Sequence, residues 1–146
     1  MTAKKFFNPK GWLLFFAALH TFMFLVPQIF MTSSAVDMVW GEGKAPPIAE
    51  FYEYQLGVLG LAYTPILVAL ALYTAGKLRA KFTIVVGLSM GAVAALNTTK
   101  NIQQEGYAED MVAFMIVMPI IIMGGLLISG WLHLNDDDST DAVTEA

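Results

Sequence analysis

The sequence predicts an all-α integral membrane protein, a four-helix up-down-up-down bundle with both termini in the cytoplasm. Two features of the chain predict this fold: it contains four long apolar stretches, and basic and acidic segments alternate between them. Hydrophobic residues make up 57% of the chain and charged residues 14%, whereas an ordinary soluble domain has roughly 45–50% and 25%. Because the apolar excess lies in blocks, it favours a bilayer over a soluble core for this one-domain chain.

The first predicted span covers residues 11–31, after a basic N-terminal segment over residues 1–10. It holds 21 residues without Asp, Glu, Lys or Arg, and such a helix is about 30 Å long, the thickness of a hydrocarbon core. A cleaved signal peptide with its cleavage site at residues 33–35 is the alternative, but the apolar block exceeds the roughly 7–15 residues of a signal sequence. Pro27 is expected to kink the span or to end its regular part.

Three further spans are expected at about residues 50–73, 82–100 and 111–134. Each is long enough to cross a bilayer as a helix, if the short apolar part of the third span is extended by the polar residues that follow it. Residues 32–50 are predicted to form a polar loop. Residues 76–81 are predicted to form a basic turn between the second and third spans.

The charges of the connecting segments decide the predicted orientation. Residues 1–10 and residues 74–81 each carry a net charge of +3, whereas residues 32–53 sum to −3 and residues 97–110 to −2. Cytoplasmic segments are enriched in Lys and Arg, so four crossings with both ends inside fit this alternation. The acidic tail over residues 135–146 is expected to be disordered, and acids contribute little to orientation.

Small residues mark the helix faces where neighbouring spans are expected to approach closely, because helices in lipid associate through tight packing. The third span carries such a stripe at four-residue spacing, and the second and fourth spans carry shorter ones. The stripe on the third span either receives the second or fourth span or forms a homodimer seam. The predicted packing residues are Gly57, Gly60, Gly87, Gly91, Ala95 and Gly125.

Polar residues at the rims of the second and third spans form a candidate ligand-binding site. Glu50 and Glu53 are three residues apart and so face the same way on a helix, and paired carboxylates can bind a cation or share a proton. Asn97 and Lys100 are expected at the same level of the third span. Either these residues form a binding mouth, which Gln28 could join, or they are a solvated helix cap with an ion pair between Glu53 and Lys100.

His20 lies in the middle of the first span, where an ionisable side chain is a functional-site hypothesis by default. It could ligate a haem, contact a quinone or relay protons, or it could be a neutral histidine that is hydrogen-bonded to a neighbouring helix. It lies nine residues, roughly 13 Å, from the start of its span. His133 lies near the cytoplasmic end of the fourth span, so the two histidines cannot share one haem iron.

Several classes of chemistry find no support in the residues. The chain has no cysteine, which removes thiolate catalysis, iron–sulfur clusters and cysteine-bound zinc. No metal site, cofactor or catalytic residue is predicted, since the paired glutamates have no histidine beside them. The net charge of −4 gives no indication of nucleic-acid binding, which needs a basic face. The expected partners are the lipid bilayer and either another membrane protein or further copies of the chain.

The order of these parts resembles the small four-span membrane proteins that include the DoxX-like proteins and the fungal sterol-biosynthesis scaffold. The resemblance covers about residues 11–133 and is carried by Leu-Val-Pro at residues 25–27, by Glu-Tyr-Gln-Leu-Gly-Val-Leu-Gly at residues 53–60, and by a basic turn before a glycine-containing third span. It implies an accessory or scaffold role beside membrane enzymes that act on quinones or lipids. The Arg common near the end of the third span in many DoxX-like sequences is absent here, where Asn97 and Lys100 stand.

From these observations we expect a non-enzymatic multi-pass membrane protein that serves as an accessory subunit or scaffold for a membrane enzyme or complex. One alternative is a membrane-embedded unit that binds or transports a small molecule or an ion as an oligomer. The other is a quinone-interacting subunit of an oxidoreductase.

Overall fold

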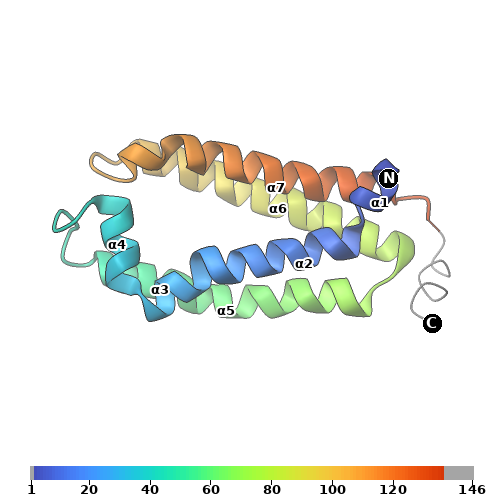
Figure 1. Cartoon of the computed structure of the whole chain (residues 1–146), viewed down its shortest axis with the longest axis horizontal. Helices are drawn as coiled ribbons and strands as arrows, with labels where there is room; N and C mark the ends of the chain where they lie inside the picture. The colour runs from blue at the N-terminus through green and yellow to red at the C-terminus, as the bar shows by residue number, and fades with distance from the viewer. Residues whose placement is uncertain (1, 137–146) are drawn as a thin grey trace.

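The computed structural model describes residues 2–136, which form helices and connecting turns without a β-strand. Four helices in this part of the chain are long and apolar enough to cross a membrane: Ala3–Phe30, Ala49–Tyr73, Gly76–Ile102 and Glu109–Leu132. They lie side by side along the long axis of the molecule, and the chain reverses direction at each connection (Figure 1). The prediction of an all-helical chain with four long apolar helices is therefore confirmed. From residue 137 onward, the acidic tail that was predicted to be disordered lies outside the described residues.

The first long helix begins with a well-defined cap. Its segments are α1 (Ala3–Phe6), α2 (Pro9–His20), η1 (Thr21–Leu25) and α3 (Val26–Phe30). The side chain of Asn8 accepts hydrogen bonds from the N–H groups of Lys10 and Gly11, which would otherwise lack partners at the start of α2. Pro9 occupies the first helical position, where its missing N–H costs nothing.

The distortion expected at Pro27 lies in the turn before the proline. η1 is a π-helical turn in which the N–H of Val26 reaches the carbonyl of Thr21, five residues back. In a regular α-helix the ring of Pro27 would press on a carbonyl of the preceding turn. The wider turn relieves that crowding, so the helix continues through the proline rather than ending there.

Two segments that the sequence predicts as connections are helical instead. The predicted loop over residues 32–50 contains α4 (Thr32–Trp40), and α6 (Gly76–Ile102) already begins at Gly76. The interpretation of residues 76–81 as a turn is wrong because Lys, Leu, Arg and Ala are strong helix formers. The reversal between α5 (Ala49–Tyr73) and α6 needs only two residues.

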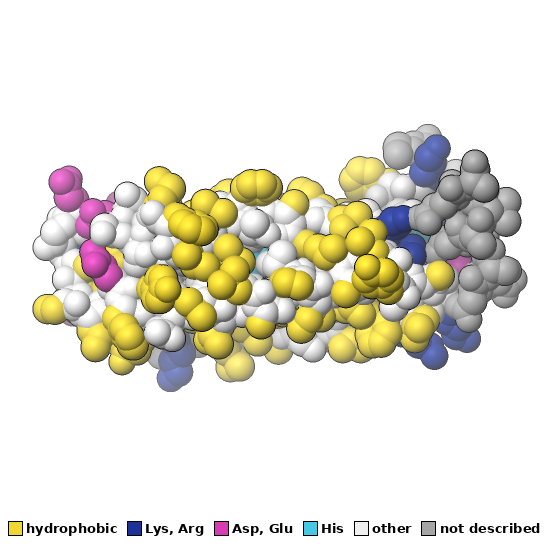
Figure 2. All heavy atoms as spheres, turned by 90° about the horizontal axis from the view of Figure 1, so that it is seen from below, with side chains coloured by type: hydrophobic (Ala, Val, Ile, Leu, Met, Phe, Trp, Pro, Cys, Tyr) yellow, Lys and Arg dark blue, Asp and Glu magenta, His cyan; other side chains and the backbone are white. Residues whose placement is uncertain are grey.

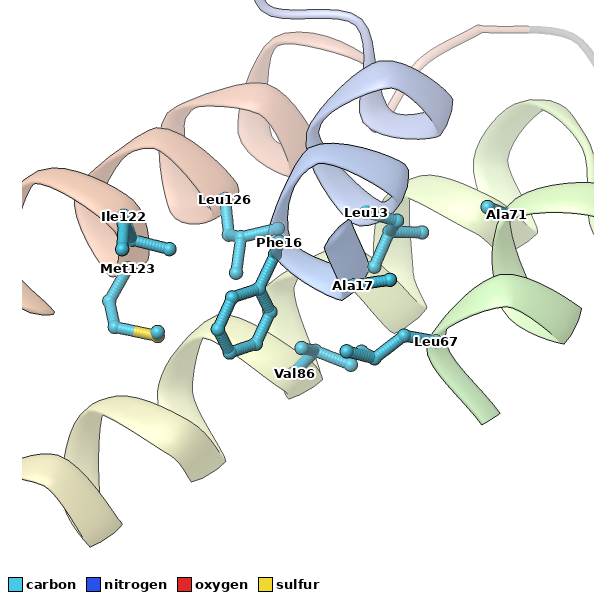
Figure 3. Packing of buried hydrophobic residues seen from close by; sticks show 9 residues of the cluster. All are labelled: Leu13, Phe16, Ala17, Leu67, Ala71, Val86, Ile122, Met123 and Leu126. Atoms are coloured by element: carbon cyan, nitrogen blue, oxygen red, sulfur yellow. The ribbon is translucent and has the colours of Figure 1, made fainter. Parts of the chain in front are cut away.

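The long helices form two close pairs that meet along α2. α6 packs along most of α7 (Val112–Leu132), which follows the short turn η2 (Glu109–Met111), and α2 packs along α5. α2 also contacts both α6 and α7, whereas α5 and α6 touch little although they are consecutive in the chain. The buried apolar core lies where α2 meets the other three helices (Figure 3). It consists of Leu13, Phe16, Ala17, Leu67, Ala71, Val86, Ile122, Met123 and Leu126.

Basic residues are concentrated at one end of the molecule and acidic residues at the other, while the sides between the two ends are apolar. The basic end comprises α1, the start of α2, the start of α6 and the end of α7, and its segments hold six of the eight Lys and Arg residues. The acidic end comprises α4, the start of α5 and the segment between α6 and α7. Figure 2 shows dark blue side chains concentrated at one end, magenta ones at the other, and hydrophobic side chains along the length between them.

Candidate functional site

A buried carboxylate at the acidic end is the centre of the candidate site. Glu53, one turn into α5, is 8% exposed. Its Oε2 accepts a hydrogen bond of 3.0 Å from Nε2 of Gln28 on α3. A charged group removed from water needs such a donor, because leaving it unpaired costs several kilocalories per mole. This hydrogen bond ties the first long helix to the second.

Gly57 allows this contact, because it lets α3 approach α5 one turn below Glu53. A β-carbon at Gly57 would lie 2.8 Å from Cγ1 of Ile29 and 2.9 Å from Cβ of Gln28. Real Cβ atoms do not approach other atoms so closely, so only glycine fits without a shift of α3. The packing role expected for Gly57 and the side chain that reaches Glu53 thus belong to the same contact.

Two segments that connect the long helices form a cap over the acidic end. This acidic-end cap consists of α4 and residues 103–108. The N–H of Ala108 donates a 2.6 Å hydrogen bond to the carbonyl of Val39, and the rings of Trp40 and Tyr107 meet edge to face at 5.1 Å. Burial raises the pKa of Tyr107, and the negative charge of Glu53 raises this pKa further.

The other predicted members of a binding mouth do not gather around Glu53. Glu50, Asn97 and Lys100 are exposed, and the last two lie on α6, which barely touches α5. Within residues 2–136, the expected ion pair between Glu53 and Lys100 is absent, since the Glu53 carboxylate takes its hydrogen bond from Gln28 instead. Helical spacing places Glu50 and Glu53 on adjoining surfaces, but the position of α3 decides that only Glu53 is buried.

His20 is bonded to the neighbouring helix in the middle of the first span. Its Nδ1 lies 2.9 Å from Oγ1 of Thr64 on α5, and its ring packs edge to face on Tyr63 at 5.5 Å. Gly60 leaves room for this ring, because a β-carbon there would lie 3.1 Å from Cε1 of His20. This geometry matches the alternative in which His20 is a histidine hydrogen-bonded between helices. The Tyr63 hydroxyl is buried beside it, without a hydrogen-bond partner among the described residues.

The remaining predicted packing residues belong to two different contacts of α7, one with α6 and one with α2. A β-carbon at Gly87 would lie 3.1 Å from Leu127, and one at Gly91 would lie 3.8 Å from Met123, so the stripe of α6 receives the fourth span. Ala95 is exposed and ends the stripe. Gly125 faces α2 instead, where a β-carbon would lie 2.0 Å from Cζ3 of Trp12.

Sequence reasoning missed Gly130, which allows the close approach of α6 and α7. A β-carbon there would lie 2.5 Å from Cγ1 of Ile84 and 2.7 Å from the carbonyl oxygen of Ala80. The only signal in the sequence is the third glycine of α7, five residues after Gly125. That spacing breaks the four-residue repeat by which small-residue stripes are found.

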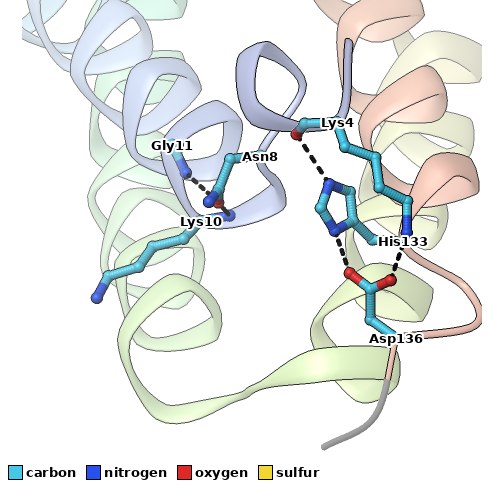
Figure 4. Close-up of polar contacts among 6 residues, drawn as sticks. All are labelled: Lys4, Asn8, Lys10, Gly11, His133 and Asp136. Carbon is cyan, nitrogen blue, oxygen red and sulfur yellow. Dashed lines mark hydrogen bonds and ion pairs between the residues drawn. The ribbon is translucent and has the colours of Figure 1, made fainter. Parts of the chain in front are cut away.

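A second polar cluster, the basic-end clasp, joins the N-terminus to the end of α7 (Figure 4). Lys4 Nζ lies 2.6 Å from Oδ1 of Asp136, and His133 Nδ1 lies 2.5 Å from Oδ2 of the same carboxylate. The other ring nitrogen of His133 lies 3.1 Å from the carbonyl oxygen of Lys4. Since the carbonyl and the carboxylate both accept, the doubly protonated ring satisfies both partners at once.

The stability of the basic-end clasp should depend on pH through the protonation of Asp136. Burial alone would raise the pKa of this carboxyl group, but hydrogen bonds from Lys4 and His133, and their positive charge, outweigh burial and lower it below its usual value of 3.8. A carboxyl group whose pKa is lower in the folded chain stabilises the fold above its unfolded pKa and ceases to do so as the pH falls through the folded value. We expect amide protons of residues 5–7, which are hydrogen-bonded in and after α1, to lose exchange protection below about pH 4.

The Asp136→Asn variant should lose the exchange protection of residues 5–7 already at neutral pH. We expect the substitution to lower the stability of the fold by less than about 1 kcal/mol. Hydrogen exchange read by mass spectrometry measures both effects. Asp110→Asn, at an exposed acid of the other end, is the matched control and should leave the exchange of residues 5–7 unchanged. An Asp136→Asn variant in which residues 5–7 are as well protected as in wild type at neutral pH would contradict the prediction.

Comparisons of the chain with protein-family models, with curated proteins and with solved structures find no match.

Proposed function

We propose that the chain is a non-enzymatic multi-pass membrane protein that acts as an accessory subunit or scaffold for a membrane enzyme or complex, with both termini in the cytoplasm. The proposal is carried by one observation: polar side chains inside the first predicted span are hydrogen-bonded to polar side chains of the second. Gln28 and Glu53 bond to each other, and so do His20 and Thr64. Both pairs join the first long helix to the second, so these groups stabilise the bundle.

The outer surface supports the same function. Large apolar side chains are exposed along α5, α6 and α7, among them Leu59, Leu88 and Ile120, each at least 59% exposed. Such faces suit lipid tails and the helices of a partner equally well, because association in a bilayer depends on packing rather than on hydrophobic burial. The resemblance in the order of parts to the DoxX-like proteins and the sterol-biosynthesis scaffold supports an accessory role beside enzymes that act on quinones or lipids.

The absence of cysteine from the chain allows a direct test by single-cysteine crosslinking in native membranes. Cysteine is placed at an exposed alanine of each long helix: Ala18, Ala62, Ala92 and Ala113. A scaffold should give an adduct with a different membrane protein from one face of the bundle and not from the others. Failure of every position to give such an adduct, in membranes where the chain is abundant, would overturn the proposal.

A membrane-embedded binding unit for a small molecule or ion is the second candidate, and the burial of Glu53 favours it. An ionisable residue inside a predicted span is a functional-site hypothesis by default, and the negative charge of Glu53 helps to raise the pKa of Tyr107 in the acidic-end cap. A single four-helix unit is thin for a transporter, so this function would need an oligomer.

Glu53→Gln distinguishes the two functions, with Glu50→Gln as the exposed control one turn away. A scaffold should tolerate both substitutions equally when each variant is returned to cells that lack the protein. Loss of function in Glu53→Gln alone, with normal expression and normal crosslinking to a partner, would favour the binding unit.

A further inference from the structure

The two pairs of long helices, α2 with α5 and α6 with α7, are joined differently at the two ends of the bundle. The buried core that joins them lies in the basic half, between the first turns of α2 and the last turns of α7. At the acidic end, α3 contacts α4 and α5 but has at most slight contact with α6 or α7 within the described chain. Core packing therefore joins the two pairs at the basic end only.

The acidic-end cap connects the two pairs at the opposite end. In Figure 1, α4 crosses from the end of α3 toward the turn between α6 and α7. The N–H of Ala108 donates a hydrogen bond of 2.6 Å to the carbonyl of Val39, and the rings of Trp40 and Tyr107 meet edge to face. A backbone hydrogen bond and a ring pair thus tie the first pair of helices to the second.

Ala108 makes this connection in a strained backbone conformation. Its φ of +51° and ψ of +31° lie in the left-handed region, and within residues 2–136 no other residue except glycine has a positive φ. In this region the β-carbon of an L-residue comes too close to the following carbonyl oxygen. Glycine has no β-carbon and avoids the cost, so an alanine here must be held in place by its surroundings.

The contacts of Ala108 are what hold it in this conformation. Its N–H is bonded to Val39, its carbonyl accepts a hydrogen bond of 2.9 Å from the N–H of Met111, and the residue is 4% exposed. The net contribution of one hydrogen bond and the cost of the left-handed conformation are of similar size. Once the bond to Val39 breaks, Ala108 is free to leave the left-handed region, so the strain favours release of the cap.

We propose that the acidic-end cap is a strained latch, whose release lets the two helix pairs part at the acidic end while the buried core keeps them together at the basic end. The strain at Ala108 brings the closed and released states closer in free energy than they would be in an unstrained latch. This inference concerns the fold alone and holds whether or not the chain is a scaffold.

Hydrogen exchange at residue 108 measures release directly, because its N–H is the donor of the latch. Ala108→Gly should raise the protection factor of this N–H in the detergent-purified chain by about threefold. That figure is the relief of strain, offset in part by the greater freedom of glycine once the latch is released. Ala35→Gly is the matched control inside α4. It should lower the protection factor, because glycine weakens a helix.

The distance between the helix pairs tests the consequence of release. The chain has no cysteine, so cysteines that carry spin labels can replace Gln55 and Ala113 near the acidic end, or Leu72 and Trp131 near the basic end, all of them exposed. Ala108→Val should add longer distances between the labels at the acidic end, because a β-branched residue rarely adopts a positive φ. Ala108→Gly should remove longer distances there. Neither variant should change the distances at the basic end.

Two results would overturn the latch. A protection factor that does not rise in Ala108→Gly would show that strain at Ala108 does not favour release. Distances at the acidic end that stay the same in Ala108→Val, or that change equally at both ends, would show that release of the cap does not part the helix pairs. Opposite effects of the two glycine substitutions, with a change of distance at the acidic end only, would support the proposal.

Discussion

Replacing Gly130 by Ala is expected to destabilise the fold by about 3 kcal/mol, at the upper end of the usual cost of overpacking. The added methyl group would lie 2.7 Å from the carbonyl oxygen of Ala80 and 2.5 Å from Cγ1 of Ile84. The Ile84 side chain can turn away, but the carbonyl belongs to the backbone of α6, so α6 and α7 must move apart. The midpoint of thermal unfolding in detergent should fall by on the order of 10 °C.

Two other glycines of the same helix provide matched controls. Gly124→Ala meets no atom within 4 Å and should leave the midpoint unchanged or raise it slightly, because alanine favours a helix by about 1 kcal/mol over glycine. The midpoint of Gly125→Ala should lie between those of Gly130→Ala and Gly124→Ala. Its added methyl group would meet the ring of Trp12, which is the far end of a side chain rather than backbone. Trp12→Leu should then partly restore stability. Equal midpoints for Gly130→Ala and Gly124→Ala would show that α6 and α7 do not approach as closely as described.

Replacing Gln28 by Leu is expected to destabilise the fold by about 2 kcal/mol, because it removes the donor of a buried acceptor without removing the acceptor. Glu53, 8% exposed, would keep its place in α5 with no partner from α3. Replacing both residues by Leu should be less harmful than Gln28→Leu alone, since an apolar pair of similar size needs no hydrogen bond. Denaturant or thermal unfolding of the three variants measures the coupling between the two side chains.

Gln55→Leu is the control for this series, because Gln55 is an exposed glutamine of α5 two residues from Glu53. It should change stability by no more than about 0.5 kcal/mol. The prediction fails if Gln28→Leu is as stable as Gln55→Leu, or if the double variant is less stable than Gln28→Leu.

Glu50 and Glu53, which the sequence predicts to form one site, have different surroundings in the structure. Glu50 and Glu53 were expected to act together because helical spacing puts them on one side of α5. The structure buries Glu53 against Gln28 and leaves Glu50 exposed. The sequence singled out Gln28 only as a residue that could join a mouth, and no local pattern indicates that α3 comes close enough to bond to Glu53. That approach depends on Gly57, which matters only once the partner helix is known.

The sequence by itself determined that the described chain is helical, with four long apolar helices and opposite charges at their connections. Those properties depend on the local composition and length of each stretch, which a linear sequence records directly. Only the tertiary structure decided that α6 pairs with α7 and α2 with α5, that residues 76–81 continue as helix, and that Glu53 and His20 find their partners on neighbouring helices. Pairing depends on which small residues lie opposite which side chains, such as Gly130 opposite Ala80, and residues 50 positions apart carry no local sign of that match.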